Sequence, residues 1–240
     1  MKLLLLLGLT LCLLSACAMG KGELQPKLAR APGASEALQR CATLFPQGRW
    51  QFVHAIAFRL ADGANGNALG VLVLDGQVIK SALMTVEGLT LFEARSAEAG
   101  ELEVLRALPP FDNREFASGL MRDVRTLFLA PPGLGQYGTL ADGTPVCRYN
   151  GGQVLTDILP REDGCWQLHT YSEYSSLRTD GCQPADSRRE QRRTRTVNAG
   201  SCGPVGSVVL PHTLELTGAG PAGYTLNLRL VSAEPLPASP

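Results

Sequence analysis

Short runs in which apolar and polar residues alternate characterise the stretch from residue 67 to residue 106. Three turn signals, Asp75-Gly76, Glu87-Gly88 and Ala99-Gly100, divide this stretch into four runs. An Asp-Gly pair between two such runs is typical of a tight β-hairpin, because both central residues of a type I′ turn need positive φ angles. The pattern therefore predicts an antiparallel meander.

The meander is apolar on both of its faces. Leu69, Val71 and Val73 share one face of the first expected strand, and Leu72 and Leu74 lie on the other. A sheet with two apolar faces either covers both or keeps one for an apolar ligand. An ordinary core and a binding surface are therefore both open interpretations.

A second periodicity, that of a helix, occurs on either side of the meander. Ser35 is the expected N-cap of a short helix that ends at Pro46, before a long strand over residues 50–60. After the meander, Asp112 and Glu115 resemble a capping box at the start of a longer helix. The apolar positions of that helix are Phe116, Leu120, Val124, Leu127 and Phe128. We expect this stripe to cover or line the concave face of the meander.

The rest of the chain returns to short apolar runs separated by turns that contain glycine. Candidate strands cover residues 136–140, 146–149, 153–159, 165–171, 175–179, 194–197, 205–216 and 224–231. Many short strands, regular turns and two helices predict a mainly β, α+β fold. In this fold one or two helices cover a curved antiparallel sheet or half-barrel.

The first 16 residues have the pattern of a signal peptide. A basic start at Lys2 and an apolar run over residues 3–14 are typical of a secretory signal, which is too short for a spanning helix of about 20 residues. Leu14-Ser15-Ala16-Cys17 resembles a bacterial lipobox, which implies acyl chains on Cys17 and cleavage before it. Ala18 at the next position implies sorting to the periplasmic face of an outer membrane. An ordinary signal peptide that happens to contain a cysteine is the alternative.

Composition sets the expected boundaries of the mature chain. Residues 17–35 are rich in Gly, Pro, Lys and Ala and predict a flexible tether behind the lipidated cysteine. Residues 36–233 predict the folded domain, and residues 234–240 a frayed, Pro-rich tail. The chain has 22 basic and 22 acidic side chains, and this balance gives no indication of nucleic-acid binding.

Five cysteines follow Cys17, and outside the cytoplasm they are more typical of disulfides than of a metal site. The spacing does not fit zinc, so we expect neither a metal nor a cofactor. We expect two disulfides among Cys147, Cys165, Cys182 and Cys202, with three possible connectivities. Cys41 is then the odd thiol, although it could replace one of the four, and a reactive thiol is the other interpretation.

The sequence lacks the motifs of the common hydrolases and nucleotide-binding enzymes. His54 lies on the apolar side of an expected strand, which is more typical of a core residue than of a catalyst. His169 and His212 lie in or beside other expected strands, and no motif surrounds Ser201. A triad assembled in space is the remaining enzymatic alternative, and we expect no catalysis.

Positive charge is concentrated in one run of the sequence. This run contains Arg188, Arg189, Arg192, Arg193 and Arg195. One interpretation is a solvated edge strand whose charge prevents aggregation. The other is a binding surface for anionic phospholipid or for an acidic protein partner.

The order of the expected elements resembles that of the LolA/LolB-like lipoprotein-carrier superfamily: a signal and lipobox, a short helix, a meander, a crossing helix and further strands. The resemblance covers residues 50–231. Pro211-His212-Thr213-Leu214-Glu215-Leu216 and Gly223-Tyr224-Thr225-Leu226-Asn227-Leu228 look like its last two strands. The resemblance implies a half-barrel whose apolar concavity binds or transfers a lipid or acyl group without catalysis. The clustered cysteines and the Arg-rich run depart from the usual carrier.

The residues that we expect to bind the ligand are Leu72, Met84, Leu91, Phe92, Phe116 and Leu120. Lipid binding predicts a partly empty apolar cavity between the sheet and the crossing helix. The alternative function is that of a structural or assembly lipoprotein of the cell envelope that binds a protein partner. It predicts a filled core and an exposed apolar patch.

Overall fold

The protein was analysed as a computed structural model, which describes residues 23–97, 101–173, 191–206, 208–220 and 223–237. Thirteen strands form one antiparallel sheet in the order β1-β7-β8-β9-β10-β11-β12-β13-β2-β3-β4-β5-β6. The elements are β1 (Ala29–Arg30), α2 (Ala34–Ala42), β2 (Arg49–Leu60), β3 (Asn65–Asp75), β4 (Val78–Met84), β5 (Thr90–Ser96), β6 (Leu102–Ala107), α3 (Arg114–Phe128), β7 (Leu134–Thr139), β8 (Pro145–Asn150), β9 (Val154–Pro160), β10 (Trp166–Glu173), β11 (Gln191–Val205), β12 (Val208–Gly218) and β13 (Tyr224–Pro235). The predicted curved sheet with two helices is confirmed.

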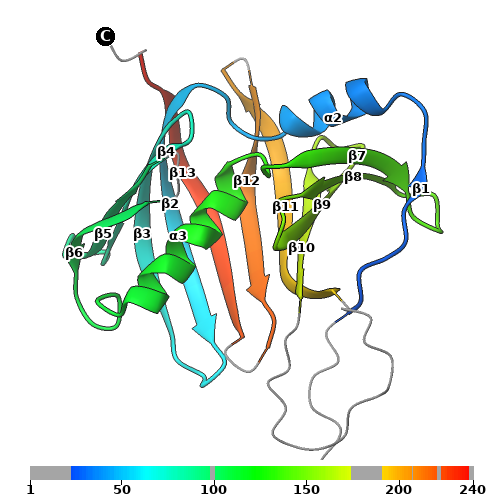
Figure 1. The fold of residues 1–240 in the computed structure, drawn as a ribbon. Coiled ribbons are helices and arrows are strands. Elements are labelled where there is room, and N and C mark those ends of the chain that lie inside the picture. Colours follow the sequence, from blue (N-terminus) through cyan, green and yellow to red (C-terminus); the bar gives the residue numbers. More distant parts are fainter. Residues whose placement is uncertain (1–22, 98–100, 174–190, 207, 221–222, 238–240) are drawn as a thin grey trace, which may run out of the picture.

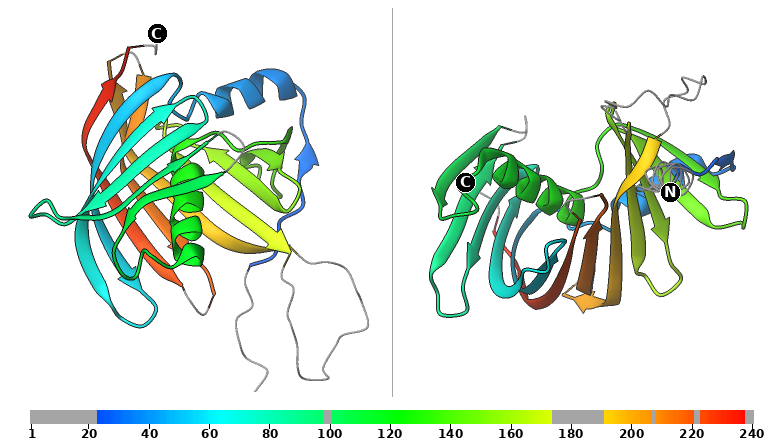
Figure 2. Two further views of the ribbon diagram at one scale, coloured as in Figure 1. Left: turned by 60° about the vertical axis from the view of Figure 1, so that its left-hand side comes forward. Right: turned by 90° about the horizontal axis from the view of Figure 1, so that it is seen from below.

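The sheet bends into an open trough, and α3 lies across its concave side (Figures 1 and 2). The predicted meander comprises β3 to β6, and its first turn is a tight hairpin. The central residues of this turn are Gly76 and Gln77, and not Asp75 and Gly76 as the sequence predicts. Asp75 pairs with Val78, and Gly76 has a φ angle of 60° at the first of the two turn positions. Glycine adopts this angle without the steric cost that other residues incur. None of the helices in the described part of the chain is long and apolar enough to span a membrane.

The crossing helix α3 begins one residue later than its sequence predicts. Asn113, and not Asp112, is the N-cap, because its Oδ1 accepts hydrogen bonds from the backbone N–H groups of Glu115 at 2.9 Å and Phe116 at 3.1 Å. Asn and Asp cap helices about equally well, so the sequence alone does not separate the two.

The first helix, α2, packs beside β7 and β8 (Figure 1). Its N-cap is Gly33 at φ 74°, in the left-handed region, and the expected cap Ser35 lies inside the first turn. This helix is covalently attached to the sheet, because Cys41 forms a disulfide with Cys147 of β8.

The second disulfide joins Cys165 to Cys202. Cys165 and Cys202, two of the four cysteines expected to form disulfides, are thus paired with each other. Cys147 bonds instead to Cys41, so the expectation that Cys41 is the unpaired thiol is wrong. Cys182 lies outside the described residues.

The N-terminal segment is not a free tether from Glu23 onward. The Gln25 N–H donates to the Gln191 carbonyl at 3.0 Å, and β1 pairs with the edge strand β7. Arg148, which forms a buried ion pair with Asp157, also donates to the Pro26 carbonyl at 3.0 Å. An extended segment satisfies its backbone groups by pairing with an open strand edge, and composition does not reveal this. The expected tail from residue 234 is likewise too long, since β13 continues to Pro235.

Candidate functional site

The concave face of the sheet carries a continuous apolar surface beneath α3. Alternation along the strands places Phe52, Leu72 and Phe92 on this face, and all three are buried. The helix contributes Met121, Leu127 and Phe128 from its buried side. The apolar stripe of α3 therefore covers the sheet, as predicted.

The space between this surface and α3 is filled. Leu72 and Phe92 are 4% and 0% exposed, and the cavity found beside Phe52 and Phe128 has a volume of only about 10 Å³. A single water molecule needs about this much space. With α3 packed on the concave face, the expectation of a partly empty cavity around these side chains is therefore wrong.

The six predicted ligand-binding residues do not share one face. Met84 pairs with Leu69, and both lie on the outer face of the sheet, away from α3. Leu91 lies at an irregularity of β5, because Phe92 pairs with Leu83 whereas Thr90 pairs with Met84, so plain alternation does not assign its face. Of the predicted ligand-binding residues in the sheet, Leu72 and Phe92 therefore lie on the face below α3, and Met84 does not.

A set of apolar residues, which we call the apolar mouth, comprises Val104 of the edge strand β6, Phe111 before α3, and Phe116 and Leu120 of α3. The Phe111 ring lies 6.0 Å from the Phe92 ring and 5.4 Å from the Phe116 ring. Phe116 is 39% exposed and Val104 is 43% exposed, although both belong to the apolar pattern. Leu120 is partly buried against the core. Of the predicted residues, Phe92 and Phe116 are thus connected through the Phe111 ring, and Leu120 packs against the same core.

A polar cluster, the Asp123 latch, holds one side of α3. Arg195 of β11 donates through Nε to Asp123 Oδ1 at 2.5 Å, and the Tyr224 hydroxyl of β13 donates to Asp123 Oδ2. Burial, together with the nearby carboxylate, raises the pKa of Tyr224 to about 12. The tyrosine therefore stays protonated and keeps donating across the physiological pH range.

A second contact, the Arg125 latch, holds the other side of the same helix. Arg125 Nη2 donates to Ser96 Oγ at 2.7 Å and to the Ala97 carbonyl at 2.6 Å. The two latches connect α3 to β5 on one side and to β11 and β13 on the other. The helix is therefore fixed by directional contacts in addition to its apolar packing.

Sequence reasoning missed the Asp123 latch, although a signal is present. Asp123 lies seven residues after Phe116 and four before Leu127, so it shares the stripe that faces the sheet. An acidic residue in a buried stripe needs a charged or hydrogen-bonded partner. The sequence prediction instead places its partner, Arg195, in the Arg-rich run.

The Arg-rich run does not form one surface among the described residues. Arg195 faces α3, and Arg193 Nη1 lies 2.8 Å from Glu23 Oε2. Arg192 pairs in register with Ser172 of β10 and with Leu24. Arg188 and Arg189 lie outside the described residues. The expected surface is therefore wrong for Arg195, whose charge is satisfied inside the molecule.

His54 is buried on the concave face, where its ring packs against aromatic side chains. Its ring lies 5.3 Å from Phe128 and 6.1 Å from Phe52. Burial lowers the pKa of His54 to about 4, so the ring is neutral at pH 7. In the described part of the chain, no three His, Cys, Asp or Glu side chains gather as a metal site would require.

The fold and this site define an open half-barrel with an apolar concave face under a latched helix. The structure is similar to that of a LolA superfamily protein from Nitrosomonas europaea, at 14% identity over 87% of this chain and 96% of that chain, with a TM-score of 0.47. It is also similar to a putative outer membrane lipoprotein-sorting protein domain from Vibrio parahaemolyticus, at 10% identity over 84% and 91% of the two chains, with a TM-score of 0.39. The sequence matches no family model and no curated protein.

Proposed function

We propose that the protein is a lipid-anchored envelope lipoprotein that binds an acyl chain between α3 and the concave face, without catalysis. The observation that carries the proposal is the apolar mouth, where Val104 and Phe116 remain 43% and 39% exposed beside a buried aromatic floor. Exposed apolar side chains that continue into a core mark a place where an apolar ligand can enter.

Entry of an acyl chain requires that α3 moves away from the sheet. Each buried CH₂ group of the chain contributes about 0.8 kcal/mol, so a chain of about 16 carbons contributes about 13 kcal/mol in gross terms. Separation of a buried ion pair such as Asp123–Arg195 costs about 3 to 5 kcal/mol. The ligand can therefore offset the loss of a latch as it replaces the helix contacts on the sheet.

The lipobox supports a membrane location for this binding site. Cys17 is six residues before Glu23, the first described residue, so the anchor and the domain are at most about 20 Å apart along an extended chain. Two or more acyl chains on Cys17 hold a protein stably at a bilayer. The proposed location is the periplasmic face of an outer membrane.

Native mass spectrometry of residues 17–240 with Cys17→Ser, combined with lipid extraction, tests the proposal. We expect fatty acid or phospholipid to co-purify with the protein and Phe116→Glu to lower uptake of an acyl probe at least tenfold. Leu134→Glu is the matched control, because Leu134 is 85% exposed in β7, outside the mouth. A lipid-free protein that takes up no acyl probe at micromolar concentrations would remove the proposal.

A protein partner is the second candidate function. The filled core beneath α3 agrees with this candidate, and an exposed strand edge also favours it. The edge strand β6 exposes Leu105 by 56%, and Leu108 just beyond it is 38% exposed. An open apolar edge can pair with a strand of another protein. Leu105→Lys would then abolish complex formation in envelope extracts while leaving acyl-probe uptake unchanged.

A further inference from the structure

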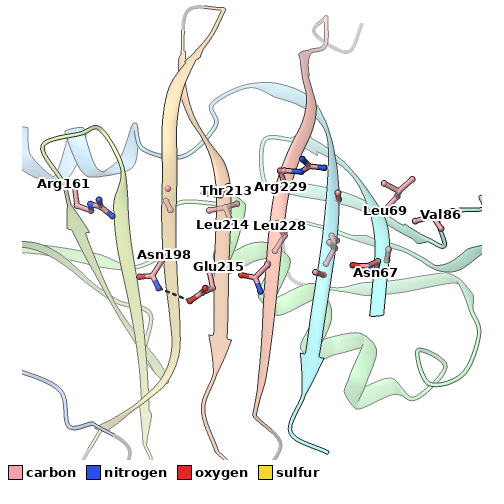
Figure 3. Close-up of a pocket in the computed structure, with 17 residues that line it drawn as sticks. Asn67, Leu69, Val86, Arg161, Asn198, Thr213, Leu214, Glu215, Leu228 and Arg229 are labelled. Atoms are coloured by element: carbon pink, nitrogen blue, oxygen red, sulfur yellow. Dashed lines mark hydrogen bonds between the residues drawn. The ribbon is translucent and has the colours of Figure 1, made fainter. Parts of the chain in front are cut away.

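The outer face of the sheet, opposite α3, contains an open groove of about 650 Å³. The groove crosses β11, β12, β13, β2 and β3, and α3 lies behind these strands in Figure 3. Its volume is in the range of ligand-binding sites. This face is separate from the apolar mouth and has a different chemistry.

Two rows of side chains run across the strands and line the groove. Register places Asn198, Glu215, Asn227, Ala57 and Asn67 side by side in the first row. The second row, two residues along each strand, consists of Gly200, Thr213, Arg229, Ala55 and Leu69. Each row spans about 19 Å, because neighbouring strands are about 4.8 Å apart.

Small residues keep the groove hollow. Ala55 and Ala57 leave space between the longer side chains of the neighbouring strands, and a Cβ atom at Gly200 would lie 2.8 Å from Thr213 Oγ1. Val86, which is 63% exposed, stands at one end of the groove, and Arg161 stands at the other (Figure 3).

The polar groups of the groove offer both donors and acceptors. Each amide can donate and accept, Thr213 can do both, and Glu215 accepts a hydrogen bond from Asn198 at 3.4 Å. Arg161 is paired with Asp163 at 2.8 Å, which leaves Arg229 and Glu215 as opposite charges in the lining. The polar side chains of the groove are near charge balance, which does not suit a polyanion, and they are set among an exposed lining that is mostly apolar.

A glycan satisfies these conditions. Its hydroxyl groups donate and accept, and its rings can lie over the small residues Ala55 and Ala57. All five strands are paired on both sides, so the groove offers no free backbone edge to which a peptide strand could add.

We infer that the groove binds a glycan that contains N-acetylated amino sugars. Asn67 and Leu69 are two residues apart on the same face of β3, and Val86 lies beside Leu69 in Figure 3. An acetamido group has the same two parts, an amide and a methyl group. The amide of Asn67 matches the first, and the apolar surface of Leu69 and Val86 matches the second.

Isothermal titration of residues 17–240 carrying Cys17→Ser with chitohexaose and cellohexaose tests the inference. The two sugars share their linkage, but only chitohexaose has acetamido groups. We expect chitohexaose to bind and cellohexaose to bind at least fivefold more weakly. Ala57→Trp, which fills the groove, should lower the affinity for chitohexaose at least tenfold.

Thr217→Trp is the matched control, because Thr217 lies on the same outer face of β12 but outside the groove lining. Absence of binding at millimolar chitohexaose, or equal binding by Ala57→Trp and wild type, would overturn the inference. Equal affinity for cellohexaose would overturn the acetamido assignment. Acyl-probe uptake by Ala57→Trp should stay at the wild-type level, which separates this test from that of the proposed function.

Discussion

The two faces of the sheet are made by the same strands but have opposite properties. The concave face is apolar, filled and covered by a helix that two polar latches hold. The outer face of the central strands is not covered by a helix and mixes polar with apolar side chains around an open groove of about 650 Å³. Since neighbouring residues of a strand point to opposite faces, one sequence can carry two separate surfaces with a period of two. We propose an apolar ligand for the first and a hydrated ligand for the second.

The largest expected difference between the faces concerns packing. Phe92→Ala should lower the free energy of unfolding by about 4 kcal/mol, because Phe92 is 0% exposed and its removal leaves a cavity. Glu93→Ala, at the next residue on the outer side, should change the free energy of unfolding by less than about 0.5 kcal/mol. Urea denaturation of both variants measures the difference, and equal costs would contradict the assignment of faces.

Loss of the Asp123 latch should weaken the closed state of the concave face. Asp123→Ala leaves the Arg195 guanidinium without its buried partner, so the free energy of unfolding should fall by about 3 kcal/mol. Acyl-probe uptake should become faster, because α3 then separates more easily. Arg122→Ala is the control on the exposed side of the same helix, and stopped-flow fluorescence measures the rate. A slower or unchanged rate in Asp123→Ala would show that the latch does not limit entry.

Acid should destabilise the concave face through His54. The folded-state pKa is about 4, and the unfolded-state value is 6.5. The unfolded chain therefore binds the proton first as the pH falls. Stability is lost between pH 6.5 and pH 4, by up to about 3 kcal/mol.

Thermal unfolding of His54→Leu across this pH range measures the effect. The variant should lose less stability than the wild type, by up to about 3 kcal/mol. If His54→Leu and the wild type decline in parallel, His54 is not the acid-sensitive group.

The smallest expected change in stability concerns the apolar mouth. Phe116→Arg should alter the free energy of unfolding by less than about 0.5 kcal/mol, because Phe116 is 39% exposed. Its acyl-probe affinity should nevertheless fall about tenfold, which equals about 1.4 kcal/mol. Fluorescence titration measures the affinity, and an unchanged value would move the entry site away from the mouth.

Local patterns predicted most of the fold but not the contacts between distant segments. The hairpin at Gly76 and the stripe of α3 follow from periodicity and turn chemistry, which act over a few residues. The bond between Cys41 and Cys147 joins residues 106 positions apart, and spacing carries no information about such a pairing. The docking of residues 23–30 depends likewise on strand edges formed by distant sequence.

The ligand-binding prediction failed in part for a physical reason. The prediction places Met84 and Leu91 with Leu72 and Phe92 because all four are apolar, but the face on which a strand residue lies depends on the register and bulges of the strand. A register shift lies between Leu83 and Met84 in the pairing of β4 with β5. Such shifts change which residues share a face, and the sequence does not mark them.

Photo-crosslinking with a diazirine fatty acid, followed by peptide mass spectrometry, tests the central claim most directly. The label should attach to Phe92, Phe116 and Leu120, on the concave side beneath α3. Labelling of Leu69, Met84 or Val86 would place the acyl chain on the outer face and contradict the account. Absence of labelling at saturating probe would contradict acyl binding altogether.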